Sequence, residues 1–362
     1  MLSLARKVED PRLHRKRLHS LPDILLLTIC AVICGADDWV SIAAFGQEKL
    51  PWLRRIGVFA NGIPSHDTLG RVFSLLSPDK FGRFFSEWMD SILKLAKGQV
   101  ISIDGKTLRG SYDTGSNKAA IHMVSAWADK NHVVIGQLKT DSKSNEITTI
   151  PKLLELLCLK GCIVTIDAMG CQREIADKVL ESGADYILSV KDNQPTLHQE
   201  VQTAFKCTPA ASTDQTITKD HGRIETRICT VIDDLRFVDE AAKWSGIVSI
   251  VKMERIRQMM SKNQSSEQTS YYISSLKTTA EQFNQNIRSH WGIENKLHWT
   301  LDVAFAEDQC RIRKGFADQN LSIVRRMALN LLKNETTAKV GIKNKRLKAG
   351  WNETYLEKVL RF

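Results

Sequence analysis

The chain has 362 residues, of which 43% are hydrophobic and 25% are charged, and its net charge is +10. This length allows two or three domains, and the composition is ordinary for a soluble globular protein. The positive charge favours a polyanionic partner, because Lys and Arg gain affinity by releasing counterions from phosphates. A basic enzyme without such a partner would have the same composition.

Cysteine usage and hydropathy exclude two further classes. The eight cysteines include no CxxC pair, and the closest spacings lie inside apolar stretches. Buried free thiols are therefore expected in place of a disulfide framework or a zinc site. The apolar run at 24–36 lies between Asp23 and Asp37 and is shorter than the roughly 20 residues of a membrane span. We expect a buried helix in a cytoplasmic protein without a membrane partner.

Residues 1–97 are predicted to form a helical N-terminal domain. Helix-start signals lie at 21–23, where Asp23 is the predicted cap, and again at 64–67 and 77–79. Apolar residues at helical spacing follow each signal. The basic side chains of this region are suited to gripping DNA, and a dimerisation or scaffolding role is an equal alternative.

The hydrophobic period changes at residue 98. Strands are predicted at 99–104, 121–128, 132–138, 163–167 and 185–190, with helices at 150–159 and 173–182. The order β-β-β-α-β-α-β over residues 98–194 is that of a ribonuclease-H-like α/β fold. In that fold the first and fourth strands are neighbours.

The second half of the chain changes character twice. Residues 195–277 are predicted to be a β-rich insertion that interrupts the core, with strands near 222–231, 247–253 and 268–274. Helix is predicted to return within 278–335, at 279–302 and 319–333. The basic tail at 336–362 is expected to be loosely ordered.

The first and fourth predicted strands each end in an aspartate. Residues 100–103 are apolar or small and lead to Asp104, and residues 162–166 lead to Asp167 in the same way. A β-branched run that closes on a carboxylate indicates a buried strand that places an acid at the rim of a sheet. Because Mg²⁺ binds one or two carboxylates together with phosphate oxygens, the pair predicts a divalent-metal site.

A third acid is predicted on the helix at 279–302. His290, Glu294, His298 and Asp302 recur every four residues and form one slowly drifting stripe of that helix. A carboxylate between imidazoles suits a metal and phosphate site. The alternative is an amphipathic helix with solvated acids, in which Trp291 and Trp299 belong to the core; core packing is also favoured over base stacking for both tryptophans.

Several motifs together resemble one known family. They are DPR at 10–12, SIDGKTLRGS at 102–111, TIDAMGCQ at 165–172, VKDNQP at 190–195, DHGRIETR at 220–227, HWGIENKLHWTLDVAF at 290–305 and EDQCRIRKG at 307–315. The chain resembles the DDE class of insertion-sequence transposases, in its H-repeat-associated branch. The resemblance covers about residues 8–335 and implies Asp104, Asp167 and Glu294 as the catalytic, metal-binding triad.

The chain departs from the wider group in one motif. The signature Y-x2-R-x3-E-x6-K falls here on Ile287, His290, Glu294 and Leu301. Contacts to terminal phosphates must therefore come from other residues, among which Arg288, His290, Lys296 and His298 are candidates. Rivals for the third acid are Asp302, Glu307 and Asp308.

The resemblance also implies a mechanism and partners. Two Mg²⁺ ions, replaceable by Mn²⁺, would serve hydrolysis of phosphodiesters at the ends of the element and joining of the 3′-hydroxyl to target DNA. The partners would be double-stranded DNA, namely terminal inverted repeats and target, and a second copy in a nucleoid-associated homodimer. The further predicted DNA contacts are Lys106, Arg109, Lys191, Asn193, His221, Arg223, Arg288, His290 and His298.

Three alternatives remain open from the sequence. A ribonuclease-H-like nuclease would share the carboxylates but would not join strands. A transposase relic would bind DNA without activity. A zinc hydrolase using His290, Glu294 and His298 is weaker, because the spacing is not HExxH and the two strand aspartates would have no role.

Overall fold

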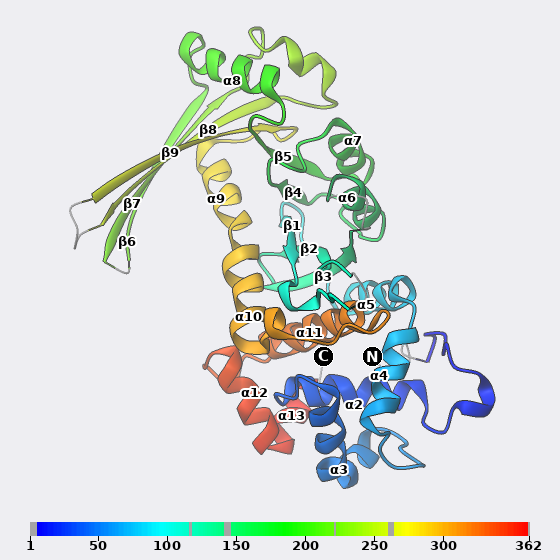
Figure 1. Ribbon diagram of the computed structural model, residues 1–362. Coiled ribbons are helices and arrows are strands. Elements are labelled where there is room, and N and C mark those ends of the chain that lie inside the picture. The colour runs from blue at the N-terminus through cyan, green and yellow to red at the C-terminus, as the bar shows by residue number, and fades with distance from the viewer. Residues whose placement is uncertain (1–5, 116–117, 141–145, 221, 260–263, 361–362) are drawn as a thin grey trace.

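The computed structural model describes residues 6–115, 118–140, 146–220, 222–259 and 264–360. In these ranges the chain is mixed α/β, with helices first, then one nine-stranded sheet with helices against it, and helices again at the C-terminus (Figure 1). No helix in the described ranges is long and apolar enough to cross a membrane. The eight cysteines all lie in these ranges and are free.

The predicted helix starts of the N-terminal region are confirmed. After a short 3-10 turn, η1 (His14–Lys16), come α2 (Leu21–Ile33), α3 (Trp39–Ile56), α4 (His66–Leu75) and α5 (Pro78–Ile92). The hydroxyls of Ser20, Ser65 and Ser77 cap α2, α4 and α5, as expected for residues that satisfy free N–H groups at a helix start.

The prediction that Asp23 caps α2 is wrong in detail. Ser20 is the cap, and Asp23 lies in the first turn of α2. The carboxylate of Asp23 accepts hydrogen bonds from the backbone N–H groups of Val58 and Phe59, at 3.0 and 3.2 Å. Phe59 has a φ of 43°, so this acid also fixes a left-handed turn beyond α3.

The predicted core strands all form, and the predicted neighbours pair. β1 (Val100–Thr107), β2 (His122–Ala128), β3 (Val133–Lys139), β4 (Ile163–Ile166) and β5 (Asp185–Val190) lie in the order β3-β2-β1-β4-β5. β1 is antiparallel to β2 and parallel to β4. The 3-10 turn η2 (Arg109–Ser111) follows β1. α6 (Glu146–Glu155), which begins four residues before the predicted start, and α7 (Arg173–Glu181) connect the later strands.

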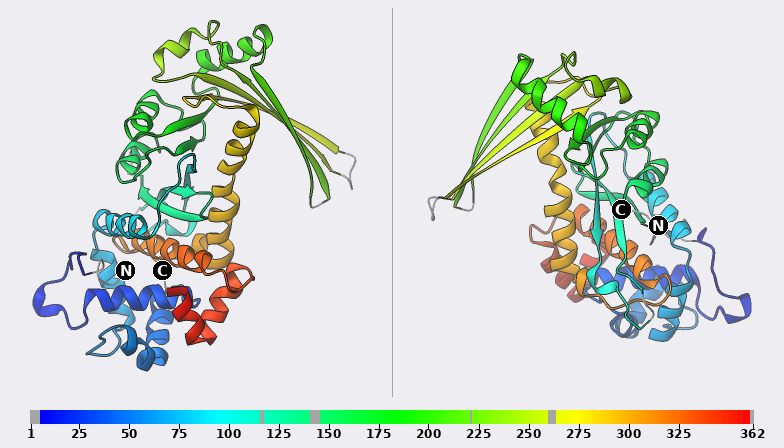
Figure 2. Two further views of the ribbon diagram at one scale, coloured as in Figure 1. Left: turned by 180° about the vertical axis from the view of Figure 1, so that it is seen from behind. Right: turned by 45° about the horizontal axis from the view of Figure 1, so that its top comes forward.

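The insertion extends the same sheet and begins with a helix. α8 (Pro195–Cys207) precedes β6 (Ser212–Asp220), β7 (Arg223–Ile232), the 3-10 turn η3 (Asp239–Lys243), β8 (Ser249–Met259) and β9 (Gln264–Ser274). β9 pairs with β5, so the order continues as β5-β9-β8-β7-β6. The free ends of these strands project away from the rest of the molecule (Figures 1 and 2).

The C-terminal helices differ from the prediction at two points. The predicted helix 279–302 is α9 (Ala280–His290), a π-helical segment η4 (Ile293–His298) and α10 (Trp299–Phe305). After the 3-10 turn η5 (Glu307–Gln309) comes the buried helix α11 (Ala317–Asn334). The tail expected to be loosely ordered forms α12 (Ile342–Trp351) and α13 (Glu353–Leu360).

One hydrophobic core joins the N-terminal helices to the sheet. It includes Ile29 of α2, Phe85 of α5, Trp127 of β2 and Leu329 of α11, because α11 packs on α2, α4, α5 and β3. A second core forms where α9 covers β7 and β8 on one side and β1 and β4 on the other. α9 therefore connects the insertion to the strands that carry the aspartates.

The tail is ordered because it bonds to the N-terminal helices. The buried guanidinium of Arg346 donates to the carbonyl of Val32 at 2.9 Å and to Asp37 at 2.6 Å, and it also bonds to the carbonyl of Ala304. On α13, Glu353 pairs with Lys49 of α3 at 3.1 Å. These contacts lie too far apart in sequence to be visible as a pattern.

Replacing Arg346 with Met should destabilise the protein by about 3 kcal/mol, because the carbonyl of Val32 loses its buried donor and the half-exposed carboxylate of Asp37 loses its partner. The measurement is urea unfolding followed by circular dichroism. Lys343→Met is the matched control, since Lys343 is exposed on the same helix, and it should unfold like the wild type. Equal stability of the two variants would contradict this role of Arg346.

Candidate active site

The parallel pairing of β1 and β4 makes Asp104 and Asp167 neighbours. Ile103 pairs with Ile166 in the register of these strands, and each aspartate is the next residue along its strand. The chain direction is the same in both strands, so both acids emerge at one edge of the sheet. The prediction that these two strands are neighbours is confirmed.

Asp104 is held in an environment that disfavours its charge. Burial raises its pKa from the ordinary 3.8 to about 7, against one stabilising hydrogen bond from the N–H of Gly105 at 2.8 Å. The negative charges of Glu146, Asp167 and Glu294 raise the pKa further. A cation at this position would relieve the repulsion that these groups exert on one another.

Asp167 occupies the turn that follows β4. Its carboxylate accepts hydrogen bonds from the N–H groups of Met169 at 3.1 Å and Gly170 at 3.4 Å. Burial and the charge of Glu146 raise its pKa, and Lys191 opposes them. Asn193 supports the same turn, because its side-chain amide donates to the carbonyl of Ala168 at 2.6 Å.

The stripe predicted on the C-terminal helix faces β1 and β4. His290 Nδ1 lies 2.9 Å from Thr165 Oγ1, His298 Nδ1 lies 3.6 Å from Asp104 Oδ2, and Asp302 pairs with Lys106 of β1. Glu294 lies within η4, whose wider π turn replaces the regular helix expected from the spacing. π turns inside α-helices recur at functional sites.

Glu294 shares a cavity with Asp167. The cavity has a volume of about 150 Å³ and is also lined by Lys191 and His290. Burial and the charge of Asp167 raise the pKa of Glu294, and Arg255 opposes them. Among the described residues, Glu294 has no hydrogen-bonding side-chain partner, so its carboxylate is available to a ligand.

The three rival acids are engaged elsewhere. Asp302 and Asp308 bind Lys106, and the fully buried Glu307 receives a hydrogen bond from Arg326 at 2.8 Å. In these ion pairs, Lys106 and Arg326 already neutralise the negative charge of the three carboxylates, which is therefore not available to a metal ion. Glu294 is the acid of this region that remains unpaired within the described ranges.

Lys106, one of the predicted DNA contacts, is bound to acids of the protein itself. Its side chain is only 8% exposed, and Nζ lies 2.5 Å from Asp302 and 3.0 Å from Asp308. The motifs 102–111 and 307–315 are thus bound to each other. Arg313 adds a hydrogen bond to the carbonyl of Gly110 at 3.1 Å. Arg109, by contrast, is 85% exposed in its side chain, with Asp308 at 3.7 Å.

Of the three predicted histidines, the two in the described residues, His290 and His298, present no positive charge to DNA. Burial lowers the pKa of His290 to about 4, and burial together with Arg326 and Lys106 lowers that of His298 to about 3. Both imidazoles are therefore neutral at neutral pH and lie between helix and sheet. His221 lies outside the described residues.

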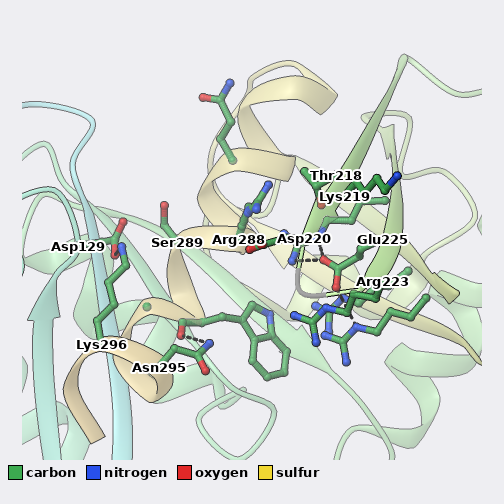
Figure 3. A pocket seen from close by; sticks show the side chains of 16 residues that line it. Asp129, Thr218, Lys219, Asp220, Arg223, Glu225, Arg288, Ser289, Asn295 and Lys296 are labelled. Carbon is green, nitrogen blue, oxygen red and sulfur yellow. Dashed lines mark hydrogen bonds and ion pairs between the residues drawn. The ribbon is translucent and has the colours of Figure 1, made fainter. Parts of the chain in front are cut away.

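A basic cavity of about 780 Å³ lies between α9 and the ends of β6, β7 and β8 (Figure 3). The predicted residues Arg223 and Arg288 line it, as does Lys296. The other basic residues of its wall are Lys219, Arg227, Arg255 and Arg257. The sequence carried a signal for these arginines, because alternate residues of a strand share a face and they recur at spacing two.

The arginines of this cavity carry more positive charge than their protein partners neutralise. Glu225 binds Arg227 and Arg257, at 2.5 and 2.8 Å. Burial, followed by the charges of Arg227 and Arg257, lowers the pKa of Arg255. The guanidinium of Arg255 lies over the ring of Trp291 at 4.8 Å, and its buried Nε has no hydrogen-bond partner among the described residues. An anion would satisfy this group.

The two tryptophans of the helix are not both in the core. Trp291 is half-buried beneath Arg255 and lines the basic cavity. Trp299 is 62% exposed, so the prediction that it packs in the core is wrong. The sequence could not separate them, because the π segment between the two residues changes the face that each presents.

Glu146 and His122 were not predicted, although both lie beside the aspartates. Glu146 is the first residue of α6, and its Oε1 lies 2.7 Å from Nε2 of His122 on β2. An acid at the start of a helix ordinarily indicates only a favourable interaction with the helix dipole. The sequence therefore gave no reason to set it apart.

The donor set suits a hard divalent cation. The acids at this edge offer carboxylate oxygens, which Mg²⁺ prefers, and mutual repulsion and burial raise their pKa values. Within the described ranges, no three His, Cys, Asp or Glu side chains already lie close enough to form a finished metal cage. Mg²⁺ sites commonly leave room for water and substrate phosphate oxygens, so an open set fits this ion.

Comparison with known proteins shows the family to which the chain belongs. The family described as "Transposase DDE domain" matches residues 95–331, and the family described as "DDE_Tnp_1-associated" matches residues 3–89. "Putative transposase YncI" of Escherichia coli O157:H7 is 46% identical, over 98% of this chain and 92% of its own length. "H repeat-associated putative transposase YhhI" of Escherichia coli K12 is 44% identical, over 98% of this chain and 95% of its own length.

Among solved structures, a piggyBac transposase synaptic complex with hairpin DNA aligns with 99% of this chain and 77% of that chain. The sequence identity is 11% and the TM-score is 0.46. Family membership follows from the sequence matches, which span both the helical region and the strands that carry the two aspartates. The chain belongs to the DDE transposase family, with H repeat-associated transposases among its relatives.

Proposed function

We propose that this transposase binds the terminal inverted repeats of an insertion element, hydrolyses phosphodiesters at its ends and joins the freed 3′-hydroxyl to target DNA. The observation that carries the proposal is the convergence of Asp104, Asp167 and Glu294 at one sheet edge, with the pKa of each raised. The strand order β3-β2-β1-β4-β5 supports a ribonuclease-H-like core.

Asp104, Asp167 and Glu294 would hold two Mg²⁺ ions, or Mn²⁺, which when bound would supply activation of the attacking oxygen and stabilisation of the leaving oxygen. The chain's own groups prepare this site. The neutral imidazole of His298 lies beside Asp104 without neutralising it, and Asn193 fixes the turn that carries Asp167. Lys106 forms ion pairs with Asp302 and Asp308, so it does not neutralise the negative charge of the triad.

The basic cavity is proposed to hold the DNA backbone near the scissile bond. Glu294 lies in η4, three residues after Trp291 and six after Arg288 of the cavity wall, so a duplex in the cavity would pass close to the triad. The predicted DNA contacts that are exposed are Arg109, Lys191, Asn193, Arg223 and Arg288. Residues 1–97 are proposed to grip the repeat, and two copies, acting in the nucleoid, would pair two ends.

Replacing Asp104 with Asn should reduce both cleavage and joining by roughly a thousandfold or more, about 4 kcal/mol of transition-state stabilisation, while end binding persists. The assay uses duplex DNA that carries the terminal repeats, with Mg²⁺ or Mn²⁺. Glu294→Gln should behave like Asp104→Asn, whereas Asp302→Asn should retain activity because Asp302 serves Lys106.

The same assay separates the alternatives. Cleavage without joining by the wild type would favour a nuclease, and binding without cleavage would favour an inactive relic. Cleavage that survives Asp104→Asn would refute the triad. Activity lost in Asp302→Asn and kept in Glu294→Gln would move the third acid to Asp302.

The raised pKa of Asp104 predicts a pH-dependent stability in the absence of divalent ions. The unfolded chain releases this proton near pH 4 and the folded chain near pH 7, so stability falls as pH rises between these values. Fully expressed, the difference is on the order of 4 kcal/mol. In EDTA, Asp104→Asn should therefore raise the melting temperature at pH 8 and change it little at pH 4.

Added Mg²⁺ provides the control for this effect. It should raise the melting temperature of the wild type at pH 8, because the ion binds the folded acids, and should raise that of Asp104→Asn much less. A variant that is destabilised at pH 8 in EDTA would contradict the unfavourable environment of this carboxylate.

The arginines of the basic cavity should act through phosphate contacts. Arg255→Gln should weaken binding of repeat DNA and reduce the slope of log K against log salt by about 1. Arg236→Gln removes an exposed arginine that is paired to Asp234 and lies outside the cavity, and its slope should match the wild type. Fluorescence anisotropy over a range of KCl measures both. An unchanged slope in Arg255→Gln would remove this residue from the interface.

A further inference from the structure

A fourth carboxylate approaches the end of β1 from the face opposite to Glu294. Glu146 begins α6, which packs on β2 and β3, whereas α9 packs on β1 and β4 from the other side of the sheet (Figure 1). Glu146 is 9% exposed, which is unusual for a glutamate at a helix start. A buried carboxylate is normally paired or bound to a metal.

Gly105 shows how closely Glu146 approaches the catalytic strand. A Cβ added at this residue would collide with Oε1 of Glu146 and with Nε2 of His122. Any other residue directly after Asp104 would therefore push these two side chains away. The glycine of the motif at 102–111 is explained by the space that Glu146 and His122 occupy.

His122 fixes the orientation of Glu146. Its Nε2 lies 2.7 Å from Oε1 of Glu146, and its Nδ1 lies 2.8 Å from Oγ1 of Thr107. The hydroxyl of Thr107 can donate to Nδ1, which leaves the Nε2 proton to donate to the carboxylate. Carboxylates that bind metals are themselves held by hydrogen bonds from neighbouring groups, and His122 supplies such a bond here.

Glu146 acts electrostatically on both aspartates. Among the acids that raise the pKa of Asp104, Glu146 has the largest effect, ahead of Asp167 and Glu294. Among those that act on Asp167, it is also the largest. Its charge is thus felt at both strand ends, and no Lys or Arg has been found within hydrogen-bonding distance of it in the described ranges.

We propose that Glu146 is a fourth carboxylate of the divalent-cation site, oriented by His122, so that donors reach the cation from both faces of the sheet. The inference rests on the proposed function of the triad. It adds a residue from the first helix of the core to acids that come from two strands and from η4. His122 acts as a positioning residue, since it contacts the carboxylate and not the cation.

Mn²⁺ binding to the full-length protein, freed of metal with EDTA, tests the proposal without reference to activity. Isothermal titration calorimetry should give an affinity at least about tenfold weaker for Glu146→Gln, and roughly tenfold weaker for His122→Phe. Glu155→Gln is the matched control, because it makes the same charge change on the exposed side of α6 and should bind as the wild type does.

Asp104→Asn distinguishes failure of this inference from failure of the triad. Weak binding in Asp104→Asn with normal binding in Glu146→Gln would overturn the role of Glu146 and leave the triad intact. Normal binding in both variants would overturn the proposed metal site itself.

Backbone cleavage of the wild type gives a second readout that does not depend on the folding of any variant. Fe²⁺ bound in place of Mg²⁺, with ascorbate and peroxide, generates hydroxyl radicals that cut the chain beside the ion. Fragments should end near residues 104, 167, 294 and 146, and excess Mg²⁺ should suppress all four cuts. Cuts near 104 and 167 without one near 146 would overturn the proposal.

Discussion

The dominant physical constraint on the site is repulsion between like charges at one edge of the sheet. Parallel pairing of β1 and β4 brings two aspartates together, and burial removes the water that would screen them. Such an arrangement costs free energy in the folded protein. It persists because the strands are fixed on both faces by helices, and because basic residues close in space are bound to other acids, as Lys106 is bound to Asp302 and Asp308.

The opposite excess of charge lies next to this edge. The arginines of β7 and β8 face α9, and Arg255 has an unpaired buried nitrogen within the described ranges. The two excesses meet at Glu294, whose pKa is raised by Asp167 and opposed by Arg255. A polyanion with bound divalent cations complements both, since its phosphates match the arginines and its cations match the acids.

Local patterns were sufficient for much of this fold. Ser20, Ser65 and Ser77 cap helices near predicted starts, and the β-branched runs before Asp104 and Asp167 are the paired strands. The site could be predicted only where it depends on strand order and helical spacing. The partners of Lys106, the tail contacts of Arg346 and the approach of Glu146 to Gly105 depend on residues distant in sequence. The exposed edge strand β6 was missed because it has few apolar residues.

The continuous core through α2, α11 and β3 has a consequence for how DNA is handled. The N-terminal helices and the strands that carry Asp104 and Asp167 share buried side chains and therefore belong to one continuous core. The distance between the N-terminal helices and these strands is therefore set by the packing of this core. If both regions hold one duplex, as the proposed function requires, that duplex would have to bend to fit this separation, and the stiffness of the element's terminal sequence would then contribute to which sequences the protein selects.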